Sequence, residues 1–192
     1  MGVRTFIAVD VNDEIRSSLQ KWQSQLRNTY DKFRWVAPEN FHITLSFLGN
    51  VDEHRTAKIA NTLQETLDEM PPFELGIFSA GAFPHKKYPR VLWAGVGEGE
   101  EKLYNLQKSV ASVLHHEHGF EPDERDYHPH ITLARGKRKV RLPNMAQELT
   151  EVQDRLWGRH FVDAIVVMKS DLQPDGPVYT DLKRLSLAPE TV

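Results

Sequence analysis

Short runs rich in apolar residues recur along the chain and predict β-strands. The first run, Thr5–Val9, is apolar almost throughout, which indicates a buried strand. Turn-forming residues such as Pro38 and Asn40 separate neighbouring runs. The predicted strands are Thr5–Val9, Phe33–Val36, His42–Leu48, Phe73–Phe83, Val91–Val96, His130–Ala134, Phe161–Met168 and Thr180–Leu187.

Apolar residues at helical spacing occur between these strands and predict helices. Asn12 can cap the first helix, which runs to about Arg27, and Asp52 can cap the second. The third helix ends near Gly119, because glycine commonly stops helices. A shorter helix is expected around Met145–Leu156. The apolar stripes of the second and third helices are Ile59, Ala60, Leu63 and Leu67, and Leu103, Leu106, Val110, Val113 and Leu114.

Strands and intervening helices occur in two similar runs, which favours an α+β fold with helices packed on strands. No low-complexity linker divides the chain, and its Pro and Gly residues are spread as turn residues. The length of 192 residues suits one domain of ordinary size, or two small lobes with a shared core. We therefore expect a single domain over residues 1–192.

The composition excludes several classes of chemistry. The chain contains no Cys, which excludes disulfides, thiolate nucleophiles and zinc sites built on sulfur, and fits a reducing compartment. No stretch approaches the roughly 20 apolar residues of a membrane span, and the first residues lead into a predicted strand instead of a signal peptide. We therefore expect a cytoplasmic protein with no membrane association and no obligate protein partner.

The net charge of −3 means that a polyanionic partner must be bound by local basic segments. Solvated surface charge is the alternative interpretation of most of these side chains. The two basic segments are His85, Lys86 and Lys87 with Arg90, and the run from Arg135 to Arg141.

One tetrapeptide occurs twice: His42–Leu45 has the sequence His-Ile-Thr-Leu, and His130–Leu133 repeats it 88 positions later. Chance alone would give an identical pair of tetrapeptides in such a chain with a frequency of roughly 0.1, so the identity needs support from context. Both copies lie in predicted strands, and both follow segments rich in turn residues. The context therefore favours an internal structural repeat.

Side chains alternate along a strand, so His42 and Thr44 share one face, as do His130 and Thr132 in the second copy. A structural repeat would place these faces across one cleft, related by a pseudo-two-fold axis. Two histidines can serve as general acid and base near neutral pH, while hydroxyls donate to phosphate oxygens. The pattern predicts metal-independent phosphodiester hydrolysis, with catalytic His42 and His130 and substrate-binding Thr44 and Thr132.

A metal site is the alternative use of the histidines. His128 and His130 project to the same side of a strand, and His115, His116 and His118 lie close together at a predicted helix end. No carboxylate stands at ligand spacing beside either group, and a helix C-terminus favours histidine in any case. We therefore expect neither a metal nor another cofactor.

These motifs resemble the signature of the 2H phosphoesterase superfamily, specifically its RNA 2′,3′-cyclic phosphodiesterases, also described as 2′-5′ RNA ligase-like proteins. The similarity covers nearly the whole chain, in the segments Arg4–Asp10, Trp35–Gly49, Arg90–Trp93 and Tyr127–Arg135. It implies a bilobal fold in which two antiparallel sheets with outer helices surround a central cleft. Each wall of that cleft would carry one of the two motifs.

The resemblance also implies roles and a substrate. His42 would protonate the leaving 3′ oxygen of an RNA 2′,3′-cyclic phosphate end, and His130 would activate water, which gives a 2′-phosphomonoester. Arg135 matches a family arginine that could bind phosphate. Alternation from His130 turns Arg135 away from the cleft unless the strand bulges. Phe6, Trp93 and Tyr127 are candidates to stack a terminal base, with core packing as their alternative use.

Two further functions stay open from the sequence. One is a related activity on 2′-5′ linked RNA, including ligation, or on small cyclic nucleotide phosphates. The other is an RNA-end binding module without catalysis. The intact histidines argue against the binding module, because Arg or Lys would serve phosphate binding equally well.

Overall fold

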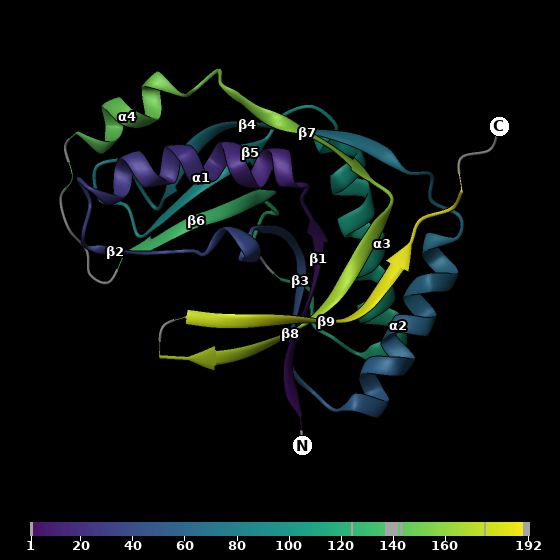
Figure 1. The fold of residues 1–192 in the computed structure, drawn as a ribbon. Coiled ribbons are helices and arrows are strands. Elements are labelled where there is room, and N and C mark those ends of the chain that lie inside the picture. The colour runs from purple at the N-terminus through teal and green to yellow at the C-terminus, as the bar shows by residue number, and fades with distance from the viewer. Residues whose placement is uncertain (1, 124, 137–141, 143, 175, 190–192) are drawn as a thin grey trace.

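The structure, a computed structural model, describes residues 2–123, 125–136, 142, 144–174 and 176–189 (Figure 1). The strands are β1 (Val3–Asp10), β2 (Phe33–Trp35), β3 (His42–Val51), β4 (Phe73–Phe83), β5 (Val91–Val96), β6 (His130–Gly136), β7 (Leu156–Val162), β8 (Ala164–Gln173) and β9 (Gly176–Ser186). The helices are α1 (Asp13–Arg27), α2 (Glu53–Leu67), α3 (Glu100–His118) and α4 (Met145–Glu151), with a 3-10 turn η1 (Pro38–Asn40).

The strands of the described residues form one antiparallel sheet in the order β7-β4-β5-β6-β3-β1-β8-β9, with β2 paired to β6. The sheet has two halves, which meet where Ile43 of β3 pairs with Ile131 of β6. The predicted α+β architecture with two antiparallel sheets is confirmed, with the addition that this pair joins the two sheets.

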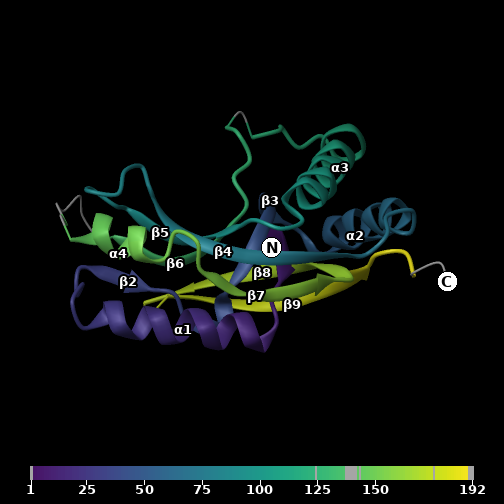
Figure 2. The same ribbon diagram turned by 90° about the horizontal axis from the view of Figure 1, so that it is seen from above.

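The helices cover both halves of the sheet. Helix α1 follows β1 in the chain but packs on β7 and β2, which belong to the other half. Helices α2 and α3 pack against each other and against β9 and β3. Figure 2 shows α1 on one side of the strands and α2 and α3 on the other. None of the described helices is long and apolar enough to span a membrane.

The predicted helix ends are confirmed where a side chain or a glycine defines them. The Asn12 carboxamide accepts a hydrogen bond from the Ile15 amide at 3.1 Å, and the Asp52 carboxylate accepts one from the Arg55 amide at 2.8 Å. Gly119 ends α3 with a φ of 65°, a left-handed conformation that glycine adopts without strain.

The prediction of one strand at Phe161–Met168 was wrong, because β7 and β8 are separate strands with a break at Asp163. Val162 and Ala164 on either side of the break are both buried, so the apolar run conceals it. Asp163 itself is exposed and forms an ion pair with Arg184 at 2.7 Å.

Two other predicted boundaries were also wrong. Helix α4 ends at Glu151, whereas the prediction extended it to Leu156, which instead begins β7. Strand β9 begins at Gly176, earlier than the predicted start at Thr180. Both errors lie beside turns, where apolar periodicity gives the weakest signal.

The core accounts for the apolar faces of the two motif strands. Ile43 and Leu45 of β3 and Ile131 and Leu133 of β6 are all buried in one cluster that runs through both halves. A second, smaller cluster lies on the opposite face of β1 and β8, where Tyr179 packs against it. The alternation predicted from the sequence therefore holds for both motifs.

Candidate active site

The two motif histidines begin the strands that join the halves of the sheet. His42 is the first residue of β3 and His130 is the first residue of β6, and both are half-buried. The residues that follow them, Ile43 and Ile131, are paired. Paired residues in an antiparallel ladder are related by a local two-fold axis, and the same axis relates the two histidines. The sequence repeat and the strand pairing therefore coincide.

This pairing brings the four predicted polar side chains onto one face. In an antiparallel ladder the residue before one partner lies opposite the residue after the other, so His42 faces Thr132 and Thr44 faces His130. Cβ atoms of such opposite residues are about 5 Å apart in a regular ladder, and diagonal pairs about 7–8 Å. Two imidazoles on a diagonal of that size can contact one phosphate group from two sides.

The backbone holds both imidazoles in the same way. Nδ1 of His42 lies 2.7 Å from the Asn40 carbonyl oxygen, and Nδ1 of His130 lies 2.6 Å from that of His128. A carbonyl oxygen only accepts, so each Nδ1 carries a hydrogen and donates it. The Nε2 atom of each ring is then the one that can exchange a proton with a substrate.

Aromatic rings surround His42. Its imidazole lies 5.0 Å from the Phe6 ring and 5.2 Å from the Tyr179 ring, measured between ring centroids. Burial lowers the pKa of His42 to about 4, while the Asn40 carbonyl and the Asp10 carboxylate act in the opposite direction. At neutral pH the free protein therefore holds His42 in its neutral form.

A second aromatic pair surrounds His130. The Phe83 ring lies 5.4 Å from its imidazole and the Trp93 ring 6.3 Å from it. Burial lowers the pKa of His130, and the charges of Arg135 and His128 lower it further. A hollow of about 180 Å³ lies beside this ring. Its lining residues are Ser79, Phe83, Trp93, Gly95, Val96, Glu100, His128, Pro129 and His130.

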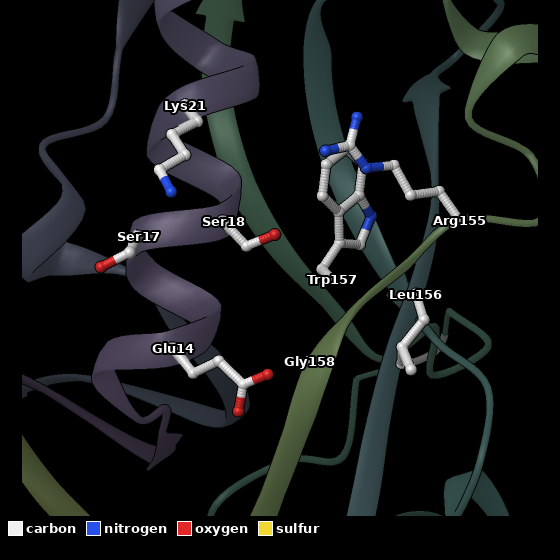
Figure 3. A pocket seen from close by; sticks show the side chains of 8 residues that line it. All are labelled: Glu14, Ser17, Ser18, Lys21, Arg155, Leu156, Trp157 and Gly158. Carbon is white, nitrogen blue, oxygen red and sulfur yellow. The ribbon is translucent and has the colours of Figure 1, made fainter.

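A larger hollow, of about 440 Å³, lies elsewhere, between α1 and β7 (Figure 3). There the Arg155 guanidinium lies 4.4 Å from the centre of the Trp157 ring. Neither motif histidine lines this hollow. We place the candidate active site at the histidines, because acid and base groups decide the chemistry and volume does not.

A bulge in β6 turns Arg135 toward the histidines. Trp93 of β5 pairs with Thr132 and its neighbour Leu92 pairs with Ala134, so β6 has one extra residue at Leu133. Leu133 and Ala134 are therefore both buried, and Arg135 follows on the face of Thr132. Burial is the main influence on three neighbouring pKa values, lowering those of His42 and His130 and raising that of Tyr179, and the Arg135 charge lowers all three.

A buried amide supports this bulge. Gln23 of α1 is 1% exposed, and its Nε2 donates hydrogen bonds to the carbonyl oxygens of Val36 at 2.7 Å and Leu133 at 3.0 Å. The Val36 amide also donates to the Leu133 carbonyl, at 2.9 Å. The carbonyl at the bulge thus accepts two hydrogen bonds, which fixes the Leu133–Ala134 peptide next to Arg135.

The two basic segments predicted from the sequence meet beside Arg135. The Gly136 amide donates to the Arg90 carbonyl at 2.8 Å, and the Leu142 amide donates to the Lys87 carbonyl at 3.0 Å. Residues 137–141 of the second segment lie outside the described residues. The start of β5 and the end of β6 thus bring the two segments together beside Arg135, where an anion can be attracted.

The aromatic predictions have different outcomes. Phe6 and Trp93 contact the histidines, as described above, whereas Tyr127 donates a hydrogen bond to the Thr44 carbonyl at 3.1 Å and packs on the core. Phe83 and Tyr179 were missed from the sequence. Tyr179 lies one residue before the strand predicted at Thr180–Leu187. Had that strand been predicted from Gly176, where β9 begins, Tyr179 would have been placed in the sheet.

The histidines of the metal alternative are not grouped with acidic ligands. Among the described residues, no cluster of three or more His, Asp or Glu side chains is placed to hold a metal ion. His115 bonds through Nδ1 to the Phe120 carbonyl at 3.0 Å, and its ring lies 4.9 Å from that of His116.

The depressed pKa of His42 predicts a dependence of stability on pH. Between pH about 6.5 and about 4 the unfolded chain binds a proton that the folded His42 does not, so the free energy of unfolding falls as the pH falls. The contribution is at most about 3 kcal/mol. Urea unfolding at pH 7 and 4.5 measures it, and His42→Gln should reduce the difference between the two pH values. An equal difference in the variant would contradict the assignment.

Comparison with known proteins gives the family. The profile of the family described as LigT-like phosphoesterase matches residues 9–93 and again residues 96–179. The chain belongs to this family. The two successive matches agree with the internal repeat, because each contains one of the two motifs.

Several curated relatives of this LigT-like chain carry the name RNA 2′,3′-cyclic phosphodiesterase. One from Methanothermobacter thermautotrophicus is 38% identical over 95% of this chain and 98% of its own length. Another, from Thermotoga maritima, is 36% identical over 92% and 91% of the two chains. Among solved structures, E. coli LigT complexed with 3′-AMP superimposes with a TM-score of 0.78 at 28% identity, over 98% of this chain and all of the other.

Proposed function

We propose that this protein hydrolyses 2′,3′-cyclic phosphodiester ends of RNA to 2′-phosphomonoesters, with His42 as general acid and His130 as general base. The observation that carries the proposal is the arrangement of the two imidazoles. A local two-fold axis relates them, a backbone carbonyl orients each through Nδ1, and both Nε2 atoms are left to exchange protons. One group can then accept a proton while the other donates one.

The reaction follows from this arrangement. Nε2 of His130 accepts a proton from water as its oxygen forms a bond to phosphorus. The bond between phosphorus and the 3′ oxygen breaks, and Nε2 of His42 gives its proton to that oxygen. The phosphate stays on the 2′ oxygen. The hydroxyls of Thr44 and Thr132 donate to the non-bridging oxygens, where negative charge increases in the transition state.

Neighbouring charges support this division of roles. Taken alone, the pKa of His42 in the free protein does not favour it as the acid, because burial lowers this pKa to about 4; burial lowers the pKa of His130 as well. The carboxylate of Asp10 raises the pKa of His42, however, against the charges of Arg16 and Arg135, whereas no nearby carboxylate among the described residues opposes the charges of Arg135 and His128 that lower the pKa of His130. We assign His42 as the acid on the basis of the Asp10 charge. A bound phosphate anion raises the pKa of both histidines, and the Asp10 carboxylate then stabilises an imidazolium at His42 as well.

Each half of the sheet contributes one histidine, so we propose that residues 1–192 act as one bilobal catalytic unit. The substrate we propose is an RNA end, and we expect the reaction to take place in the cytoplasm. The name shared by the curated relatives favours hydrolysis over the ligation, small cyclic nucleotide and binding-module alternatives.

Turnover of a short oligonucleotide with a 2′,3′-cyclic phosphate end, in excess EDTA, tests the proposal. We expect full activity without divalent metal, because the two imidazoles supply both proton transfers. The position of the phosphate in the product is identified by phosphorus NMR, and we expect it on the 2′ oxygen. A requirement for added metal, or a 3′-phosphate product, would contradict the mechanism.

A further inference from the structure

An exposed aromatic side chain lies next to the proposed active site. Phe47 of β3 is 65% exposed, and it pairs with Phe6 of β1 with ring centroids 6.0 Å apart. The Phe6 ring in turn lies 5.0 Å from the His42 imidazole. Two ring contacts therefore connect Phe47 to the acid of the proposed reaction.

The strand register places Phe47 on the face of the site. Ala8 and Phe6 share one face of β1 by alternation, and they pair with Thr44 and Phe47 of β3. Strand β3 has an extra residue between these two pairs, which restores Phe47 to the face of Thr44. Without this bulge Phe47 would point away from the histidines.

The position of Phe47 fits a base that is one nucleotide away from the reacting end. The cyclic phosphate lies on the terminal ribose, so the terminal base is within reach of the rings that touch the imidazoles. Phe47 lies one ring farther along, at the distance where the base of the preceding nucleotide, joined through the 5′ oxygen of the terminal ribose, would lie. Phe6 between them is only 2% exposed and cannot offer its face, whereas Phe47 exposes most of its ring.

A cation lies on the same face. Arg4 is exposed on β1, two residues before Phe6, and so shares its side of the strand. Burial raises the pKa of Tyr179, and the charges of Arg135 and Arg4 lower it, which indicates that Arg4 lies near this ring. Proteins hold single-stranded nucleic acids without reading their sequence by combining such cations with exposed aromatic rings.

We propose that Phe47 is a stacking platform for the nucleobase that precedes the terminal nucleotide of the RNA, with Arg4 beside the phosphodiester that joins the two nucleotides. The proposal rests on the proposed function and adds a second subsite to it. Because stacking at this distance is equal in the ground and transition states, it lowers KM and leaves kcat unchanged. The subsite makes the enzyme favour RNA strands over mononucleotides.

The test compares adenosine 2′,3′-cyclic phosphate with the diadenosine dinucleotide that ends in the same cyclic phosphate. In Phe47→Ala we expect the ratio of kcat/KM for the dinucleotide to that for the mononucleotide to fall at least about five-fold, the least that stacking of one base contributes. Phe47→Trp should restore the ratio. A dinucleotide with an abasic first residue should lose its advantage in the wild type and be unaffected by Phe47→Ala.

Phe161→Ala is the matched control, because Phe161 is 49% exposed and pairs with Glu74, at the opposite end of β4 from Phe83. This variant should keep the wild-type ratio. An unchanged ratio in Phe47→Ala would overturn the proposal. Calorimetry with the dinucleotide 2′-phosphate tests the subsite separately. If the wild type hydrolyses neither substrate but Phe47→Ala weakens this binding at least about five-fold, the proposed function fails and the subsite stands; equal affinities overturn the subsite.

Discussion

Replacing His42 or His130 by Ala is expected to lower kcat on a 2′,3′-cyclic RNA end by about 10²–10⁴-fold, the usual contribution of one positioned acid or base. The fall in kcat of the double variant should be little larger than that of the less active single variant, because both groups act in one transition state. Steady-state kinetics measures this, with thermal unfolding as a check on folding. His54→Ala, at an exposed position in the first turn of α2, is the control and should keep the wild-type rate.

The two histidines can be told apart by changing the leaving group. A p-nitrophenyl phosphodiester expels a weakly basic oxygen and needs little help from an acid, whereas attack by water still needs a base. The loss in His42→Ala should therefore shrink on this substrate, and the loss in His130→Ala should persist. The reverse pattern would exchange the roles. Rates near wild type in either variant on the RNA end would contradict the acid and base pair.

The catalytic face could be predicted from the sequence because its signal is local. Period-two alternation from His42 puts Thr44 beside it and Ile43 behind it, and the structure buries Ile43 and Ile131 as the pair that joins the sheets. The spacing of the repeat then specified which residues are related by the two-fold axis. No contact between distant strands had to be known in advance.

Other features depend on tertiary contacts that leave no trace in the pattern. The break at Asp163 lies between two buried apolar residues, and it is fixed by the Arg184 ion pair and by the Leu187 amide, which donates to the Asp163 carbonyl at 2.8 Å. Tyr179 was missed because β9 begins at Gly176, before the residues at Thr180–Leu187 from which the strand was predicted. Phe83 reaches His130 only through the pairing of β4, β5 and β6.

Arg135 is the residue for which strict alternation gave the wrong side. Counted from His130, it should face away from the site, but the extra residue at Leu133 reverses the count. The support for that bulge comes from Gln23, which is distant in sequence and donates to the Leu133 carbonyl. A polar residue buried in a helix that faces a motif strand is the kind of signal that could reveal such a bulge.

Arg135→Leu is accordingly expected to lower kcat/KM by about 10²–10³-fold, as loss of one donor to a developing oxyanion does. Arg135→Lys should recover part of the loss, because it keeps the charge but not the planar fork. The Arg135 charge lowers the pKa of both histidines, so its removal should also shift both limbs of the pH profile of kcat/KM to higher pH. A residue that only supported the fold would lower the rate without this shift.

The matched control is Arg27→Leu, which removes the same charge at the exposed end of α1. It should change neither the rate nor the pH profile, because surface charges more than a Debye length apart are largely screened. If Arg135→Leu reduces kcat/KM no more than this control, the bulge does not bring Arg135 to the phosphate. The histidines and threonines would then bind the phosphate without Arg135.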